Sequence, residues 1–192
     1  PKTIPTPYEN YFPEPVVRSD AHKIQHQSPT PAQALQIASE AVYNRRFYDA
    51  ARRLICDHRP DAAYLLNINN HISPSVIDAC HEEGVPVVMR MSDFNLVCAS
   101  NMYYRDGRPC TDCRGGLHHA IQHRCVHGSL AKTALSVFAN SWHRWSGVYK
   151  KVSAFVAPSE FMRQDLVGLG FDPASVHQVN TFVETQEAPE QP

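Results

Sequence analysis

The chain has 192 residues, of which 43% are apolar, enough for one domain with a well-buried core and too few for two large ones. Its eighteen Lys and Arg residues and nineteen Asp and Glu residues nearly cancel. The total charge of −1 therefore gives no electrostatic signature of a protein that binds nucleic acid or an anionic membrane surface. No apolar run approaches the roughly eighteen residues that predict a membrane-spanning helix.

Residues 1–30 are rich in proline and polar side chains and have no hydrophobic periodicity, which predicts an extended lead-in. Thr30, Pro31 and Gln33 then provide an N-cap, a proline for the first turn and a capping-box partner, so we expect a helix over about 31–43. The side chains expected to face inward are Ala34, Leu35, Ala38, Ala41 and Val42 in this helix, and Phe47, Ala50, Ala51, Leu54 and Ile55 in a second helix over about 45–58.

Strands and helices alternate over the rest of the chain. This alternation is typical of an open parallel sheet with right-handed crossovers, so the expected fold class is α/β with a Rossmann-like sheet flanked by helices. The expected strands are Ala62–Ile68, Val85–Met91, Ser153–Ala157 and Val176–Val179, and the expected helices run from Ser73 to about His81, from Ser129 to Lys151 and from Ser159 to about Leu169. The long helix carries Leu130, Ala134, Val137, Phe138 and Trp145 on its apolar side.

Polar side chains follow three of the expected strands. Ligands of open parallel sheets bind at the carboxyl ends of the strands, so these three clusters should converge on one edge. Asp93 and Ser92 are the candidate catalytic residues, although Asp93 could instead cap the following turn, and Ser159 could be only a helix N-cap. The candidate substrate-binding residues are Asn67, Asn69, His71, Asn95, Ser159 and Glu160, although Asn69 and Asn70 could be only turn residues after a strand.

Four cysteines cluster around a CxxC pair after the second expected strand. Two thiolates this close can chelate one ion with little chain strain, and the flanking pair can complete a tetrahedron, which predicts a structural Zn²⁺ site. Because Cys56 and Cys80 fall inside expected helices, the pattern favours a metal site in the reducing cytoplasm over a secreted disulfide framework. The clustered cysteines are Cys98, Cys110, Cys113 and Cys125, and the nearby histidines that could replace one thiolate are His118, His119, His123 and His127.

Two further classes of protein are compatible with these cysteines. One is a zinc-knuckle interaction module that binds nucleic acid, but the neutral charge and the lack of interleaved aromatic and basic residues in Cys110–Cys125 argue against it. The other is a redox protein in which Cys110 and Cys113 exchange thiol and disulfide. The chain has no G-x-G-x-x-G after a strand, and its CxxC lies in an expected loop, which argues against this second class.

Five ordered segments carry more information than any single motif: HRPDAAYLLNINNHISPSVIDAC, GVPVVMRMSDFNLVC, YYRDGRPCTDCRGG, HRCVHGSLAKTAL, and FVAPSEFMRQDLVGLGF followed by VNTFVE. They resemble the N-terminal domain of the family 4 glycosyltransferases of the two-domain GT-B fold, above all enzymes of bacterial exopolysaccharide and capsule assembly. Relatives read roughly RPDVVHLHN…HLSPS, GVPVVMTLHDYKLVCP and FIAPSRFLRDKLVEAGF at the first, second and fifth segments. The resemblance covers about 43–183, three-quarters of the chain.

The resemblance implies transfer of a sugar from a nucleotide sugar to a glycan or lipid-linked acceptor, with retention of the anomeric configuration and no organic cofactor. It also implies a partial acceptor-side domain over 31–183, with a cysteine-rich insertion over about 96–128 and a polar tail over 184–192. The family's first strand with its glycine-rich loop has no counterpart before residue 31, and the C-terminal nucleotide-sugar domain has none. Half a cleft cannot orient donor and acceptor or exclude water, so we expect the isolated chain to be inactive.

The chain departs from the family pattern at several polar positions. Ser92 stands where relatives have a histidine, and a serine cannot supply the charge or the proton chemistry of an imidazole. Tyr64 and Leu66 also replace histidines, and Glu160 stands where relatives often have arginine. Activity would then depend on Ser92 and Asp93 as a pair.

Membrane association is a separate question, because enzymes of this family often work at the inner membrane face. Four cations, Lys132, Arg144, Lys150 and Lys151, are spread over the long expected helix and its end. This spread favours a solvated helix face over a basic amphipathic helix.

Overall fold

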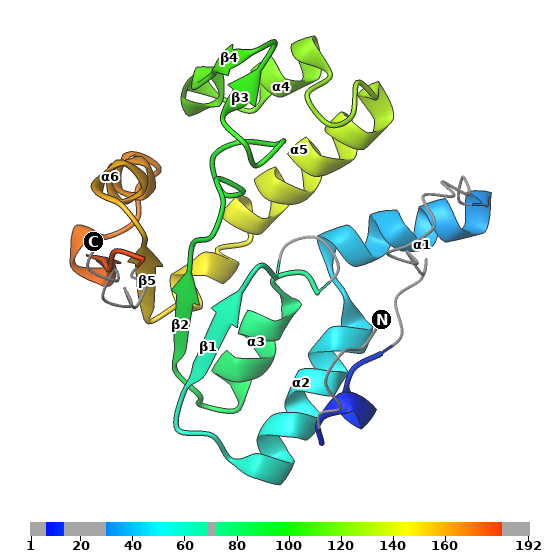
Figure 1. Ribbon diagram of the computed structural model, residues 1–192. Coiled ribbons are helices and arrows are strands. Elements are labelled where there is room, and N and C mark those ends of the chain that lie inside the picture. The colour runs from blue at the N-terminus through cyan, green and yellow to red at the C-terminus, as the bar shows by residue number, and fades with distance from the viewer. Residues whose placement is uncertain (1–6, 14–29, 69–71, 182–192) are drawn as a thin grey trace, which may run out of the picture.

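The computed structural model describes residues 7–13, 30–68 and 72–181 of the chain (Figure 1). Four parallel strands form the main sheet in the order β1-β2-β5-β6, and helices pack on it, so the predicted α/β fold class is confirmed. The strands are β1 (Ala63–Leu66), β2 (Val87–Arg90), β5 (Ala154–Ala157) and β6 (Val176–Gln178). The crossovers contain α3 (Ser75–Glu82), α5 (Leu130–Trp145), the 3₁₀ helix η3 (Val148–Lys151), α6 (Glu160–Gly168) and the 3₁₀ helix η4 (Pro173–Ser175).

The main hydrophobic core lies between one face of this sheet and the helices that cover it. The strand order steps in one direction along the sequence, so right-handed crossovers bring their helices to the same face. On that face Met89 and Phe155 are paired in register and are 2% and 1% exposed. We call the sheet together with α2 (Arg45–His58), α3, η3 and α6 the sheet layer.

The opposite face of the sheet is only partly covered. Tyr64 and Leu66 on β1 are 57% and 44% exposed, and Val88 and Val156 beside them are half-buried. Parallel sheets are normally buried on both faces. Within the described residues, this second face therefore leaves apolar side chains available to further polypeptide.

The N-terminal helices follow their predicted caps. The side chain of Thr30 accepts a hydrogen bond from the Gln33 backbone N–H and completes the capping box of α1 (Pro31–Val42). The inward packing expected of this helix is wrong for Ala34 and Leu35, which are exposed, the latter to 73%, whereas Ala38, Ala41 and Val42 are half-buried. A short 3₁₀ helix, η1 (Glu9–Tyr11), lies against α2.

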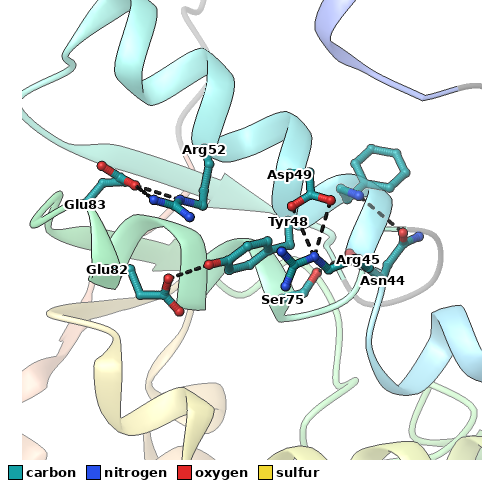
Figure 2. A network of polar contacts seen from close by, with 9 residues as sticks. Asn44, Arg45, Tyr48, Asp49, Arg52, Ser75, Glu82 and Glu83 are labelled. Carbon is teal, nitrogen blue, oxygen red and sulfur yellow. Dashed lines mark hydrogen bonds and ion pairs between the residues drawn. The ribbon is translucent and has the colours of Figure 1, made fainter.

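Polar contacts join α2 to α3 in the sheet layer (Figure 2). The Tyr48 hydroxyl donates to Glu82, and Arg52 forms an ion pair with Glu83. The Ser75 hydroxyl at the start of α3 donates to the Asn44 carbonyl at a distance of 2.9 Å. These bonds therefore fix α2 against α3.

Helix α5 is shorter than expected, and most of its predicted apolar side is exposed rather than buried. It ends at Trp145, and Gly147, at φ +74°, separates it from η3. Its buried side chains are Thr133, Ala139 and His143. On its predicted apolar side Val137 is half-buried against Ala99, Cys113, Leu117 and Ala120, whereas Leu130, Ala134, Phe138 and Trp145 are exposed. In Figure 1 this helix (yellow) extends away from the sheet.

Residues 96–128, the cysteine-rich segment, lie beyond the carboxyl end of β2. They contain the hairpin β3 (Tyr104–Arg105) and β4 (Arg108–Pro109), the 3₁₀ helix η2 (Asp112–Gly115) and α4 (His118–His123). Asp106 and Gly107 have φ angles of +52° and +80° and form the hairpin turn. The hairpin and α4 are absent from the sequence-based expectations, although an Asp-Gly pair is a strong hairpin signal.

Candidate functional site

Three predicted polar clusters follow strands that end at one edge of the sheet. Leu66, Arg90 and Val156 are neighbours in register across β1, β2 and β5. Asn67 follows β1 directly and is exposed, with φ at +50°. The predicted positions Asn69 and His71 lie outside the described residues.

The second cluster, Ser92–Asn95, follows β2. Ser92 is exposed, and Asp93 is half-buried, with its Oδ1 accepting a hydrogen bond from the Asn95 N–H at 3.0 Å. Burial raises the pKa of Asp93, and this hydrogen bond opposes the rise. Asn95 is 4% exposed, and its Oδ1 has no hydrogen-bond partner among the described residues.

The third cluster is the start of α6. The Ser159 side chain accepts from the Met162 N–H at 3.3 Å and is therefore an N-cap, the alternative role considered for it. Glu160 accepts from Arg163 at 2.7 Å and from Gln164 at 3.1 Å, and these bonds lower the pKa of its carboxyl. Ser159 and Glu160 both stabilise the first turn of α6.

Aromatic packing holds the second and third clusters together. Phe94 stacks on Tyr103, with ring centroids 4.3 Å apart, and meets the edge of Phe161 at 5.9 Å. Since Phe94 follows Asp93 and Phe161 follows Glu160, the two polar loops are positioned by the same contact. Asp93 and Glu160 therefore belong to neighbouring loops at one edge.

An ion pair that sequence reasoning missed links the cysteine-rich segment to α6. Arg114 lies 2.6 Å from Asp165, whose side chain is 4% exposed, and its guanidinium lies 4.8 Å from the centre of the Phe161 ring. The two residues are far apart in sequence, and nothing in the segments that contain them indicates that they pair. They line a shallow hollow together with Val97, Gln164, Gly168 and Leu169.

The four predicted metal ligands are free thiols. A hydrogen bond from Cys113 is the main reason that the pKa of Cys98 is lowered, and the same bond raises the pKa of Cys113. Burial is the main cause of the raised pKa of Cys125, with further contributions from Cys98 and Cys110. Cys98 and Cys113 are buried and share this hydrogen bond, and Cys125 packs against the small core that contains Cys113.

These thiols are not arranged as a finished metal site. In the part of the chain that the structure describes, no three His, Cys, Asp or Glu side chains form a group that could hold a metal ion. The imidazoles of His118 and His119 on α4 pack on each other, with centroids 4.0 Å apart. The zinc site therefore stays a prediction.

None of the described helices is long and apolar enough to cross a lipid bilayer. The longest, α5, has sixteen residues.

A comparison of the chain with protein-family models, with curated proteins and with solved structures finds no match.

Proposed function

We propose that the chain is the acceptor-side domain of a glycosyltransferase that moves a sugar from a nucleotide sugar to a glycan or lipid-linked acceptor, with retention. The observation that carries the proposal is the juxtaposition of Ser92–Asn95 with the start of α6 at the carboxyl edge of a parallel sheet. Ligands of such sheets bind at this edge. Two of the segments that resemble family 4 glycosyltransferases, GVPVVMRMSDFNLVC and FVAPSEFMRQDLVGLGF, contain these two loops.

Asp93 is the residue best suited to contact an acceptor hydroxyl. Its carboxylate uses Oδ1 for the Asn95 N–H, the one hydrogen bond it forms among the described residues, and its raised pKa makes it a better proton acceptor than an exposed aspartate. Ser92 is exposed beside it and can donate a hydrogen bond to a sugar. The nucleotide sugar would bind mainly to a C-terminal domain.

The chemistry of the cysteines fits a structural Zn²⁺ held by Cys98, Cys110, Cys113 and Cys125. Four thiolates would fill a tetrahedral site and leave no position for a reacting water, so the metal would stabilise the fold of the segment. Two contacts among these residues support the proposal: Cys98 and Cys113 share a hydrogen bond, and Cys125 packs against the small core that contains Cys113.

The clustering of the cysteines also favours a second candidate function, a zinc-knuckle interaction module without catalysis. In that case the partner would contact the cysteine-rich segment rather than the edge of the sheet. The two functions therefore differ in which residues a ligand perturbs.

Nuclear magnetic resonance of the full chain, titrated with a panel of oligosaccharides, tests the proposal. We expect shifts in the signals of Ser92–Asn95 and Glu160, and we expect Asp93→Asn to weaken binding about tenfold, as loss of a charged hydrogen bond does. Asp172→Asn is a matched control, because its Oδ1 also accepts the N–H two residues ahead, at 2.9 Å. Equal weakening by both variants, or shifts confined to 110–125, would count against an acceptor site at the edge.

Turnover gives an independent check. We expect the isolated chain to transfer no sugar from common uridine or guanosine diphosphate sugars to these oligosaccharides. One side of an interdomain cleft, without the other, excludes water poorly. Measurable turnover would overturn the proposal that the donor side lies in another domain.

A further inference from the structure

Arg90, the last residue of β2, is the only Lys, Arg, Asp or Glu residue in the four strands of the main sheet. Strands of parallel sheets are usually continuous apolar runs. Arg90 lies in register between Leu66 on β1 and Val156 on β5, and its side chain is half-buried. An ionised side chain between apolar neighbours costs free energy unless a partner compensates its charge. A negatively charged partner is therefore expected for Arg90.

No carboxylate among the described residues is that partner. In this part of the chain the Arg90 guanidinium forms one hydrogen bond, from Nη2 to the Thr181 hydroxyl at 2.9 Å. Asp93, three residues further along the chain, accepts from the Asn95 N–H instead. A guanidinium has five N–H donors in a planar fork. Most donors of Arg90 therefore remain available to a ligand.

The bond to Thr181 holds the guanidinium at the carboxyl edge of the sheet. Thr181 follows β6, and β5 lies between β2 and β6, so the bond joins two strand ends across a third. His177 on β6 is in register with Val156 and is exposed, so it adds a second nitrogen group to the same row. This row, which runs from Leu66 through Arg90 and Val156 to His177, contains no acidic residue.

Arg90 and Ser92 lie on the same side of the chain. The alternation of burial continues past the end of β2, because Met91 is 2% exposed whereas Ser92 is exposed. The Met91 N–H donates to the Val156 carbonyl at 2.9 Å, as in a continued strand. Residues two apart in an extended chain point to the same side and lie about 7 Å apart. A ligand that contacts Ser92 can therefore also reach the Arg90 guanidinium.

We propose that Arg90 binds a carboxylate or phosphate of the acceptor and so restricts the acceptor to sugars that carry a negative charge. Arginine binds both groups through paired, charge-assisted hydrogen bonds. This inference rests on the proposed acceptor site at the edge and adds the chemical class of its ligand. An acidic sugar would supply the charge partner of Arg90 and would orient its hydroxyls toward Ser92 and Asp93.

Nuclear magnetic resonance titrations of the full chain with two matched pairs of sugars test the proposal. Cellobiose is paired with cellobiouronic acid, in which a carboxylate replaces one hydroxymethyl group, and methyl glucoside is paired with glucose 1-phosphate. We expect at least one acidic sugar to bind about tenfold more tightly than its neutral partner and to shift the signals of Ser92 and the Arg90 side chain. The pair with the larger difference identifies the anion as a carboxylate or a phosphate.

Substitution of Arg90 identifies the group that causes the preference. Arg90→Gln should bring each acidic sugar to within about twofold of its neutral partner, whereas Arg90→Lys, which keeps the charge but loses the planar fork, should retain part of the preference. Arg108→Gln is the matched control, because Arg108 is an exposed arginine on β4 that forms no ion pair among the described residues. It should leave the preference unchanged.

Equal binding of acidic and neutral sugars would contradict the proposal, and so would a preference that survives in Arg90→Gln. If Asp93→Asn still weakens the binding of every sugar in that case, the acceptor site at the edge stands and only its preference for acids is wrong. The absence of any sugar-induced shift at Ser92–Asn95 would count against both. The dispersion of the amide signals of each variant shows whether its fold is retained.

Discussion

The sheet layer and the cysteine-rich segment are built on very different cores. The main core buries large apolar side chains of the sheet layer such as Phe155, Ile77 and Met89, and it also contains Leu96, Val97, Cys98 and Tyr103 from the start of the cysteine-rich segment. The rest of that segment has only a second core of Ala99, Cys113, Leu117 and Ala120. Burial of four mostly small side chains stabilises little, and small units of this kind usually need a metal or a disulfide. The difference implies that the segment depends on other contacts in a way that the sheet layer does not.

Those other contacts attach the segment to α5 and α6. The Ser136 hydroxyl donates to the Ala99 carbonyl at 3.0 Å, and the Thr133 hydroxyl accepts from the Val126 N–H at 3.0 Å. Arg114 adds the ion pair to Asp165. A loosened cysteine-rich segment would therefore also disturb α6, whose first turn borders the candidate acceptor site.

Metal removal should separate the two regions most strongly. Structural Zn²⁺ contributes about 10 kcal/mol or more to the folding of zinc-finger peptides, so chelation should abolish hydrogen-exchange protection over 98–128 and leave the strands β2 and β5 protected. Elemental analysis before chelation should find about one zinc per chain. A metal-free chain with the same protection in both regions would show that the segment needs no metal.

The sheet layer should instead respond to loss of its largest side chain. Phe155→Ala removes a ring that is 1% exposed and should lower the free energy of unfolding by about 3–5 kcal/mol in a urea titration. Phe138→Ala, at 57% exposure, should change it by less than about 1 kcal/mol. Similar losses in both variants would mean that the apolar side of α5 is buried in solution.

The ion pair between the regions should have an intermediate and asymmetric effect. Arg114→Met leaves the buried Asp165 carboxylate without its partner and should cost about 2 kcal/mol, whereas Asp165→Asn leaves a half-exposed guanidinium that water can solvate and should cost about 1 kcal/mol. Denaturant unfolding measures both. The reverse order would indicate that Asp165 is hydrated.

Local chemistry explains what could be predicted from the sequence. The Thr30 capping box and the Ser159 N-cap involve groups within one helical turn, and both form as expected. The apolar runs before Ser92 and Pro158 gave strands because their side chains fill one core. These features need no knowledge of distant residues.

The remaining features depend on contacts between distant parts of the chain. Periodicity identified the apolar side of α5, but it cannot tell whether anything covers that side. Among the described residues Val137 packs against the second core, whereas Leu130, Phe138 and Trp145 are exposed. Arg114 and Asp165 meet only because the cysteine-rich segment folds back on α6. Asp93 and Glu160 could be assigned to one edge from the strand order, but their hydrogen bonds to Asn95 and Arg163 could not.

The smallest expected effect is a pH dependence where α5 meets α1. The His143 Nε2–H donates to the Val42 carbonyl at 2.8 Å, and burial lowers the pKa of this imidazole below its usual 6.5. Both folded and unfolded states are neutral above that value, so this contribution to stability is complete there and is lost as pH falls toward the lowered folded pKa. Urea titrations across this range should show the loss, and His143→Gln, which keeps an N–H donor, should flatten it. An unchanged slope in His143→Gln would assign the pH dependence to other groups.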